Sequence, residues 1–165
     1  MKKTLFTLLL LTITLSNYAA KPILAKDLAG KYYVNMCEMM PVLSAEIVKG
    51  AEGLTTDTVC NHLWLEISID ENTLALRLTK KTIKYLKSIN FYDEEYSGVL
   101  FASPYKVSKK GKVFIDRDDK KELIGSIQID EKAGTMTFSF VKDKQKEAER
   151  QGYSKQFTLK KSKKK

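Results

Sequence analysis

The residues that could carry acid–base chemistry lie apart from one another in this chain. His62 is the single histidine, and Glu66 follows it four positions later in a segment with strand periodicity. Positions four apart on a strand are separated by ~13 Å, which is too far for direct contact between a catalytic acid and base. We therefore expect His62 to be a surface or edge residue.

No other pattern of residues predicts catalysis or a resident metal. Asp116, Asp118 and Asp119 form an acidic cluster, but it lacks the spaced oxygen ligands and the distal glutamate of a calcium loop, so it indicates a turn. The sequence contains no nucleophile elbow, zinc-protease motif, phosphate loop or dinucleotide fingerprint. We predict that the protein is not an enzyme and uses no metal or cofactor.

Residues 1–20 have the three parts of a secretory signal peptide. Two lysines in the first three positions precede an uncharged, Leu-rich stretch over 5–15 and a small-residue end at Ala20. The stretch is shorter than the ~20 residues of a membrane-spanning helix, which disfavours an uncleaved anchor. We expect cleavage after Ala20, with Ala19 and Ala25 as alternatives, and a secreted or periplasmic product.

The chain has two cysteines, Cys37 and Cys60, and export would place them in an oxidising compartment. An even number of cysteines in an exported protein predicts a disulfide, so we expect these two to be bonded. A bridge that closes a loop of roughly 24 residues stabilises a fold by ~3 kcal/mol on the chain-entropy model. Two thiols and one histidine are too few for a structural zinc site without carboxylates.

The positive charge of the chain is concentrated at its ends. The formal net charge is +9, of which the signal peptide carries two and the five lysines of 160–165 carry five, so residues 21–159 are left at +2. Residues 21–159 are predicted to form one domain that does not bind nucleic acid, because such domains carry their basic excess on a folded face. We expect 160–165 to be a disordered, solubilising tail. The alternative is a weak tether to an anionic surface through the tail lysines, Lys160, Lys161, Lys163, Lys164 and Lys165.

Period-two alternation of apolar and polar residues dominates the domain and predicts β-strands. The clearest hairpin joins 62–70 to 74–79, and a second joins 123–129 to 136–140. Further strands are expected at the other alternating segments, 32–36, 99–107, 113–115 and 153–159.

Four segments interrupt the alternation. Residues 41–50 predict a short helix, with Pro in its first turn and Gly at its end. Residues 51–59 indicate a loop, and 142–150 predict a helix that stops before Gly152. Residues 80–92 fit either a strand or a helix, and we favour a strand because the neighbouring segments pair as strands.

We therefore predict an all-β fold, an antiparallel meander of eight to nine strands. Closure into a barrel protects the edges of such a meander. An eight-stranded barrel is just wide enough to be filled by side chains or to hold one small ligand.

The segment from Leu28 to Val34 reads Leu-Ala-Gly-Lys-Tyr-Tyr-Val and resembles the Gly-X-Trp opening of lipocalins, other calycins and avidins. Gly30 matches that opening, and Tyr32 stands where those families have the aromatic residue that closes one end of the barrel. The order of elements over 28–159 is also similar to that of lipocalins, with a lid-like connection after the first strand and a helix before the last. The resemblance implies a calyx that binds a small, often apolar, ligand.

The candidate ligand contacts in such a calyx are aromatic and sulfur-containing side chains, Tyr32, Met36, Trp64, Phe138 and Phe140. Trp64 lies on the mixed face of its strand, so it either faces a ligand or is covered from outside by a helix or lid. The aliphatic character of the opposite face favours the outside position.

We expect a monomeric, exported, lipocalin-like binding protein that holds a small apolar ligand. The alternative is a periplasmic or surface protein–protein interaction module, such as an inhibitor or host-interaction factor, with a filled barrel. A hollow barrel interior favours the first hypothesis and a packed interior favours the second.

Overall fold

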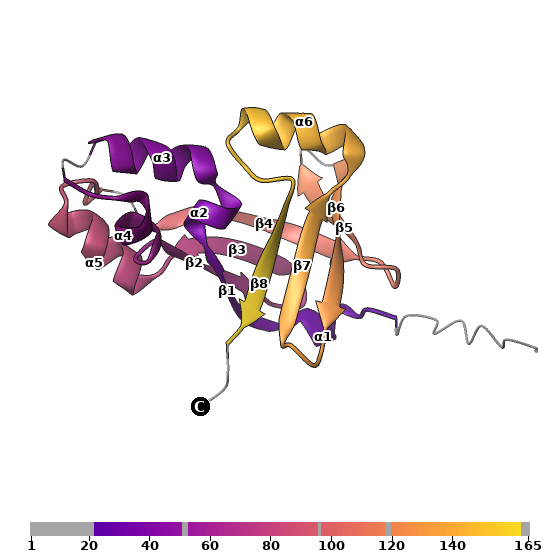
Figure 1. Cartoon of the computed structure of the whole chain (residues 1–165). Helices are drawn as coiled ribbons and strands as arrows, with labels where there is room; N and C mark the ends of the chain where they lie inside the picture. Colours follow the sequence, from indigo (N-terminus) through magenta and orange to yellow (C-terminus); the bar gives the residue numbers. More distant parts are fainter. Residues whose placement is uncertain (1–21, 51–52, 96, 118–119, 163–165) are drawn as a thin grey trace, which may run out of the picture.

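Eight antiparallel strands form a closed barrel in meander order, which confirms the predicted all-β barrel (Figure 1). The computed structural model describes residues 22–50, 53–95, 97–117 and 120–162. The expected signal peptide, 1–20, and the last three lysines lie outside these residues. The strands are β1 (Gly30–Asn35), β2 (Trp64–Ile69), β3 (Thr73–Leu78), β4 (Val99–Val107), β5 (Lys112–Arg117), β6 (Lys120–Asp130), β7 (Thr135–Phe140) and β8 (Gln156–Lys161).

Six helices connect or flank these strands within the described residues. They are α1 (Ala25–Leu28), α2 (Met36–Met39), α3 (Pro41–Gly50), α4 (Thr56–Cys60), α5 (Lys80–Ser88) and α6 (Lys142–Arg150). The helices predicted over 41–50 and 142–150 are confirmed as α3 and α6. The expected loop 51–59 is partly wrong, because α4 begins within it. The Thr55 side chain caps α4 by accepting a hydrogen bond from the Thr58 backbone N–H.

The strand favoured over 80–92 is wrong, because this segment forms α5. The Thr79 side chain caps the helix by accepting a hydrogen bond from the Thr82 N–H. Thr82 is fully buried, and its hydroxyl lies 2.7 Å from both the N and the O of Trp64, so it ties α5 to β2. Buried Leu86 and half-buried Ile83 continue this inner face, a helical rather than a strand spacing.

The strand connections divide between the two ends of the barrel, since successive strands of a meander run in opposite directions. The short turns after β2, β4 and β6 lie at one end together with α1, and we call this the turn end (Figure 1). The helices α2 to α6 connect strands at the opposite end, which we call the helix end.

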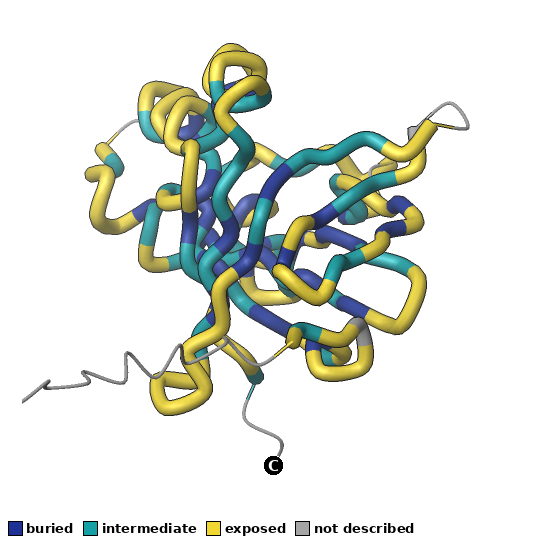
Figure 2. Tube along the Cα trace, turned by 90° about the vertical axis from the view of Figure 1, so that its right-hand side faces the viewer, coloured by how far each residue is buried: buried dark blue, intermediate teal, exposed yellow. Residues whose placement is uncertain are grey.

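The alternating side chains give the barrel an apolar interior and a polar exterior, visible as alternating buried and exposed segments in Figure 2. On β2, Leu65 and Ile67 point inward and are buried. On the outer face Glu66 accepts hydrogen bonds from Lys31 and Tyr33 of β1, at 2.9 and 3.2 Å. Desolvation raises the pKa of the Glu66 carboxyl, but the hydrogen bonds to it and the charge of Lys31 together outweigh desolvation. The pKa of Glu66 is therefore lowered overall.

Helix α1 closes the turn end, where the last residues of β8 pair with β1. Leu28 of α1 is only 2% exposed, and the Lys161 ammonium lies 5.7 Å from the centre of the Tyr32 ring. Lys160 and Lys161 pair with Tyr33 and Tyr32. The prediction of a disordered tail from residue 160 is therefore wrong for these two lysines, because closing the barrel needs them as strand residues.

The predicted disulfide between Cys37 and Cys60 is present, with a Cα–Cα distance of 5.7 Å. It joins α2 to the end of α4. The Asn35 side chain supports both cysteines, because its amide donates to the Cys60 carbonyl at 2.7 Å and its oxygen accepts from the Cys37 N–H at 2.9 Å. The long connection between β1 and β2 is thus fixed at its two ends.

Replacement of both cysteines, Cys37→Ser with Cys60→Ser, is expected to lower the free energy of unfolding by about 3 kcal/mol, because the unfolded chain regains the freedom of the released loop. Urea denaturation followed by far-ultraviolet circular dichroism measures this change. The wild-type protein in excess reductant serves as the control and should match the variant. An unchanged unfolding midpoint would contradict the stabilising role of the bridge.

Candidate functional site

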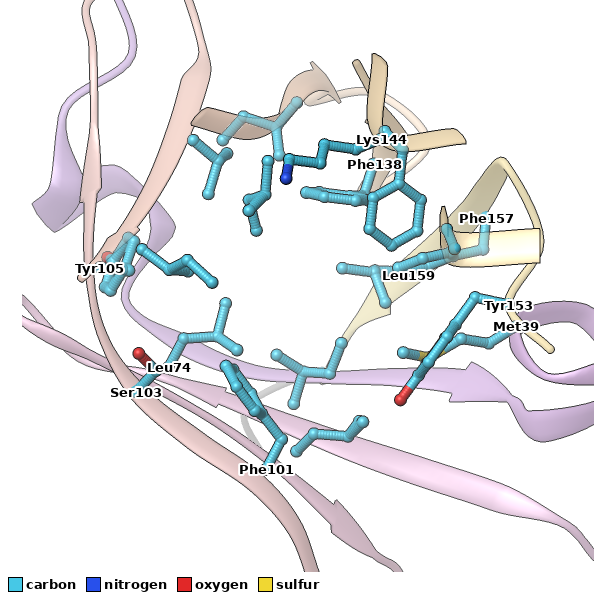
Figure 3. A pocket seen from close by; sticks show the side chains of 18 of the residues that line it. Met39, Leu74, Phe101, Ser103, Tyr105, Phe138, Lys144, Tyr153, Phe157 and Leu159 are labelled. Carbon is cyan, nitrogen blue, oxygen red and sulfur yellow. The ribbon is translucent and has the colours of Figure 1, made fainter. Parts of the chain in front are cut away.

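The barrel interior holds a cavity of about 430 Å³ (Figure 3). This volume falls within the range of small-molecule binding sites, ~300–1,000 Å³. Residues of β2 to β8 form its wall, α6 contributes at the helix end, and Leu28 lies at the turn end. The cavity is thus the hollow core of the barrel itself.

The cavity wall is mainly aliphatic and aromatic. Phe138 of β7 is central to its aromatic part, since its ring stacks on that of Phe157 at 5.2 Å and meets the edge of Phe140 at 5.0 Å between ring centres. The other apolar wall residues are Leu28, Met39, Ile67, Ile69, Leu74, Leu76, Phe101, Val113, Ile115, Ile124, Ile127, Met136, Ala148 and Leu159.

A β-bulge between β5 and β6 changes which residues of β6 face the cavity. Val113 pairs with Gly125, but the next residue of β5, Phe114, pairs with Leu123. Ile127 faces inward on one side of the bulge. Beyond the bulge the inward residues of β6 are Ile124 and Glu122, and all three residues line the cavity. Unbroken alternation from Leu123 does not predict Ile124 and Glu122 as wall residues.

Glycine is required at the bulge because an aromatic ring covers position 125. A Cβ atom added to Gly125 would collide with the Phe138 ring and lie 2.6 Å from the Ser139 carbonyl oxygen. The signal that marks this site in the sequence is a glycine inside a strand pattern.

Helix α6 covers the cavity at the helix end. Its wall residues Lys144, Glu147 and Ala148, together with the C-cap residue Gln151, follow helical spacing and form one stripe. The helix is attached to the barrel wall by two hydrogen bonds, from the Val141 N–H to the Ile124 carbonyl and from the Gln145 side chain to the Phe140 carbonyl, each 3.1 Å. The lid of the cavity is therefore α6, and no described residue of 41–59 lines it.

Three charged side chains meet where this lid contacts the barrel wall, and we call Glu122 of β6 and Lys144 and Glu147 of α6 the charged triad. The Lys144 ammonium forms an ion pair with Glu122 and a second with Glu147 at 3.4 Å. Lys144 is 31%, Glu122 28% and Glu147 47% exposed, so the triad lies at the border between the apolar interior and solvent, with Glu147 on its solvent side. The hydrogen bond to Glu122 raises the pKa of Lys144 from its ordinary value of 10.5.

The opposite side of the cavity from Lys144 carries Phe101 of β4, which remains 40% exposed (Figure 3). Deeper in the wall the Ser103 hydroxyl is nearly buried and donates to the Pro104 carbonyl at 3.1 Å. Met39 and Tyr153 complete this part of the wall. Burial raises the pKa of the Tyr153 phenol.

The candidate ligand contacts from the sequence fall in three different places. Phe138 and Phe140 line the cavity. Tyr32 and Met36 are buried core residues that do not belong to the cavity wall. Trp64 lies on the outer face of β2, where its indole N–H donates to the Asn61 carbonyl at 3.3 Å. The sequence favoured this outside position for Trp64. Trp64 does not line the cavity, so it is not a ligand contact there.

The structure places His62 against α5 and Asp116, one member of the acidic cluster, in β5. The His62 ring stacks on Tyr85 of α5 with 4.4 Å between ring centres and is partly buried. Asp118 and Asp119 lie outside the described residues. Within the described ranges, no three His, Cys, Asp or Glu side chains are placed to hold a metal ion. The helices of these ranges are also too short or too polar to cross a membrane.

Tyr105 is expected to make stability depend on pH in the alkaline range. Its hydroxyl lines the cavity region and donates to the Asp70 carbonyl at 2.8 Å, and burial raises its pKa from 10.0 to about 12. Between these values the unfolded chain releases the phenolic proton and the folded chain keeps it, so the free energy of unfolding decreases as pH rises.

Denaturation curves at several pH values between 10 and 12 measure this loss. The variant Tyr105→Phe should be less stable at neutral pH, because it leaves the Asp70 carbonyl without its donor. It should also lose less stability than the wild type over the alkaline interval. An equal alkaline loss in both proteins would show that Tyr105 is not its source.

Comparison with protein-family models, with curated proteins and with solved structures gives no match for this chain. The physical properties of the barrel interior therefore carry the functional assignment. They are an apolar cavity that is closed at the turn end by Leu28, covered at the helix end by α6, and bordered there by the charged triad.

Proposed function

We propose that this protein is an exported, lipocalin-like binding protein that holds one small apolar ligand in its barrel. The observation that carries the proposal is the cavity of about 430 Å³ with its mainly aliphatic and aromatic wall. A filled barrel would suit the alternative, a protein–protein interaction module, so the hollow interior supports the ligand-binding function instead.

The wall supplies the driving force for binding. A ligand that removes ~400 Å² of apolar surface from water gains ~10 kcal/mol. The loss of translational and rotational freedom cancels a large part of this gain. This loss costs at least ~4 kcal/mol. We therefore expect a binding free energy of at most ~6 kcal/mol, which corresponds to a dissociation constant between micromolar and millimolar.

The ligand is expected to enter at the helix end. Phe101 is partly exposed on one side of the cavity, and Lys144 of α6 lies across from it (Figure 3). The turn end offers a worse path, because Leu28 is buried there and the Lys161 side chain lies beside the Tyr32 ring.

The proposed export has two supports. One is the signal-peptide pattern of residues 1–20, which lie outside the described residues. The other is the disulfide between Cys37 and Cys60, since disulfides persist in oxidising compartments and are rare in the cytosol.

Titration with the neutral apolar dye N-phenylnaphthylamine tests the binding function. The dye should show a saturable rise in fluorescence as it leaves water for the cavity. Its own emission is the suitable signal, because Trp64, the single tryptophan, lies on the outer face of the barrel.

The variant Ile115→Trp should weaken dye binding at least tenfold, because the indole fills space in the cavity. The matched control is Phe114→Trp, the neighbouring residue of β5, which does not line the cavity and should leave the affinity unchanged. Circular dichroism establishes that both variants fold. Absence of saturable binding to the wild type, or equal affinity of the two variants, would contradict the proposed site.

A further inference from the structure

Within the described residues, the cavity wall carries one hydroxyl group without a hydrogen-bond partner, that of Tyr153. The wall has two other hydroxyl groups there, and both are used within the protein. The Ser103 hydroxyl donates to the Pro104 carbonyl at 3.1 Å, and the Tyr105 hydroxyl donates to the Asp70 carbonyl at 2.8 Å. The Tyr153 hydroxyl forms no hydrogen bond with the described part of the chain, although its side chain is half-buried.

The backbone around Tyr153 is fixed by the way in which α6 ends. Gly152 has a φ of +82° and ends the helix in a Schellman motif, in which the Tyr153 N–H donates to the Ala148 carbonyl at 2.9 Å. The N–H of the next residue, Ser154, donates to the Met39 carbonyl at 2.9 Å. Tyr153 is therefore held between α6 and α2, which limits the positions that its ring can take.

The Tyr153 ring carries its hydroxyl toward the side of the cavity at which we expect the ligand to enter. The ring meets the edge of Phe140 at 6.4 Å between ring centres, and its oxygen is directed toward the side that carries Phe101 (Figure 3). Among the described side chains, the polar atom that is both buried and unpaired belongs to Tyr85 of α5. The Tyr153 oxygen is therefore open to water or to a ligand.

An accessible hydroxyl on an apolar wall has to be satisfied by water or by the ligand. A hydrocarbon that displaces the water leaves the Tyr153 hydroxyl unpaired, which opposes binding. A ligand with an oxygen acceptor at the same position replaces the hydrogen bond that the water made. The wall therefore distinguishes two apolar ligands of the same shape by whether one of them carries such an acceptor.

We propose that Tyr153 binds the ligand by donating a hydrogen bond to an oxygen acceptor, and that the natural ligand is an apolar molecule with a ketone or ester carbonyl. The rest of the ligand lies against the aliphatic and aromatic wall. This inference rests on the proposed binding function of the cavity and adds the chemistry of the ligand's polar group to it.

Butyrophenone and butylbenzene test the inference, because they differ only by a carbonyl in place of one methylene group. Their affinities are measured through displacement of N-phenylnaphthylamine, after the affinity of each protein variant for the dye has been measured directly. The variant Tyr153→Phe removes the hydroxyl and keeps the ring. It should weaken the binding of butyrophenone roughly fivefold and should not weaken the binding of butylbenzene.

The matched control is Tyr33→Phe, which removes a hydroxyl from the outer face of the barrel. The Tyr33 hydroxyl donates to Glu66 at 3.2 Å, and Tyr33 does not line the cavity. This control should leave both affinities unchanged. Without ligand, Tyr153→Phe should keep the wild-type midpoint of urea unfolding, because the hydroxyl that it loses has no described partner.

The outcomes separate the two proposals. If neither the dye nor butylbenzene binds to the wild type, the proposed binding function fails and this inference fails with it. If butylbenzene binds but Tyr153→Phe changes the two affinities equally, or changes neither, the binding function stands and the role of Tyr153 is overturned. A lower unfolding midpoint of Tyr153→Phe without ligand also overturns that role, because the hydroxyl would then be bonded within the protein.

Discussion

The pairing of β8 with β1 is the interaction on which the rest of the structure depends, because it closes the sheet into a barrel in which every strand has a neighbouring strand on both sides. The contact is short and uses Lys160 and Lys161, the last residues of β8, against Tyr33 and Tyr32. Once the barrel is closed, its strand number sets its width, and eight strands enclose a space that side chains fill only in part. The cavity is therefore a consequence of closure combined with the inward side chains.

The two ends of the barrel have different roles because the meander sends its long connections to one of them. At the turn end, α1 and the short turns close the interior. At the helix end, α2 is joined to α4 by the Cys37–Cys60 disulfide, while α6 is attached through one backbone hydrogen bond, one hydrogen bond from the Gln145 side chain, and the charged triad. Helix α6, which lines the cavity, is thus held to the barrel by polar contacts where the cavity meets solvent.

The character of the site depends on one irregularity in the sheet. The bulge opposite Val113 and Phe114 turns Glu122 toward the cavity, and Gly125 leaves room for the Phe138 ring. Without the bulge, the inward set of β6 would continue from Gly125 to Leu123, and the ammonium of Lys144 would lose its partner on the barrel wall. An apolar cavity with a charged border follows from this shift of one residue.

The sequence by itself determined the features that arise from local preference, which are the strand hairpins, the helices at 41–50 and 142–150, and the inward aliphatic face of β2. It also determined the cysteine pair, since the chain has no other cysteines. Residues 80–88 fit both a strand and a helix locally, and the contact of Thr82 with β2 decided for the helix; tertiary structure also decided that Lys160 and Lys161 belong to a strand. It also decided which aromatic residues line the cavity. These features depend on strand register and on contacts with residues far away in the chain. The periodicity of a segment shows only which of its residues are apolar on one face and polar on the other.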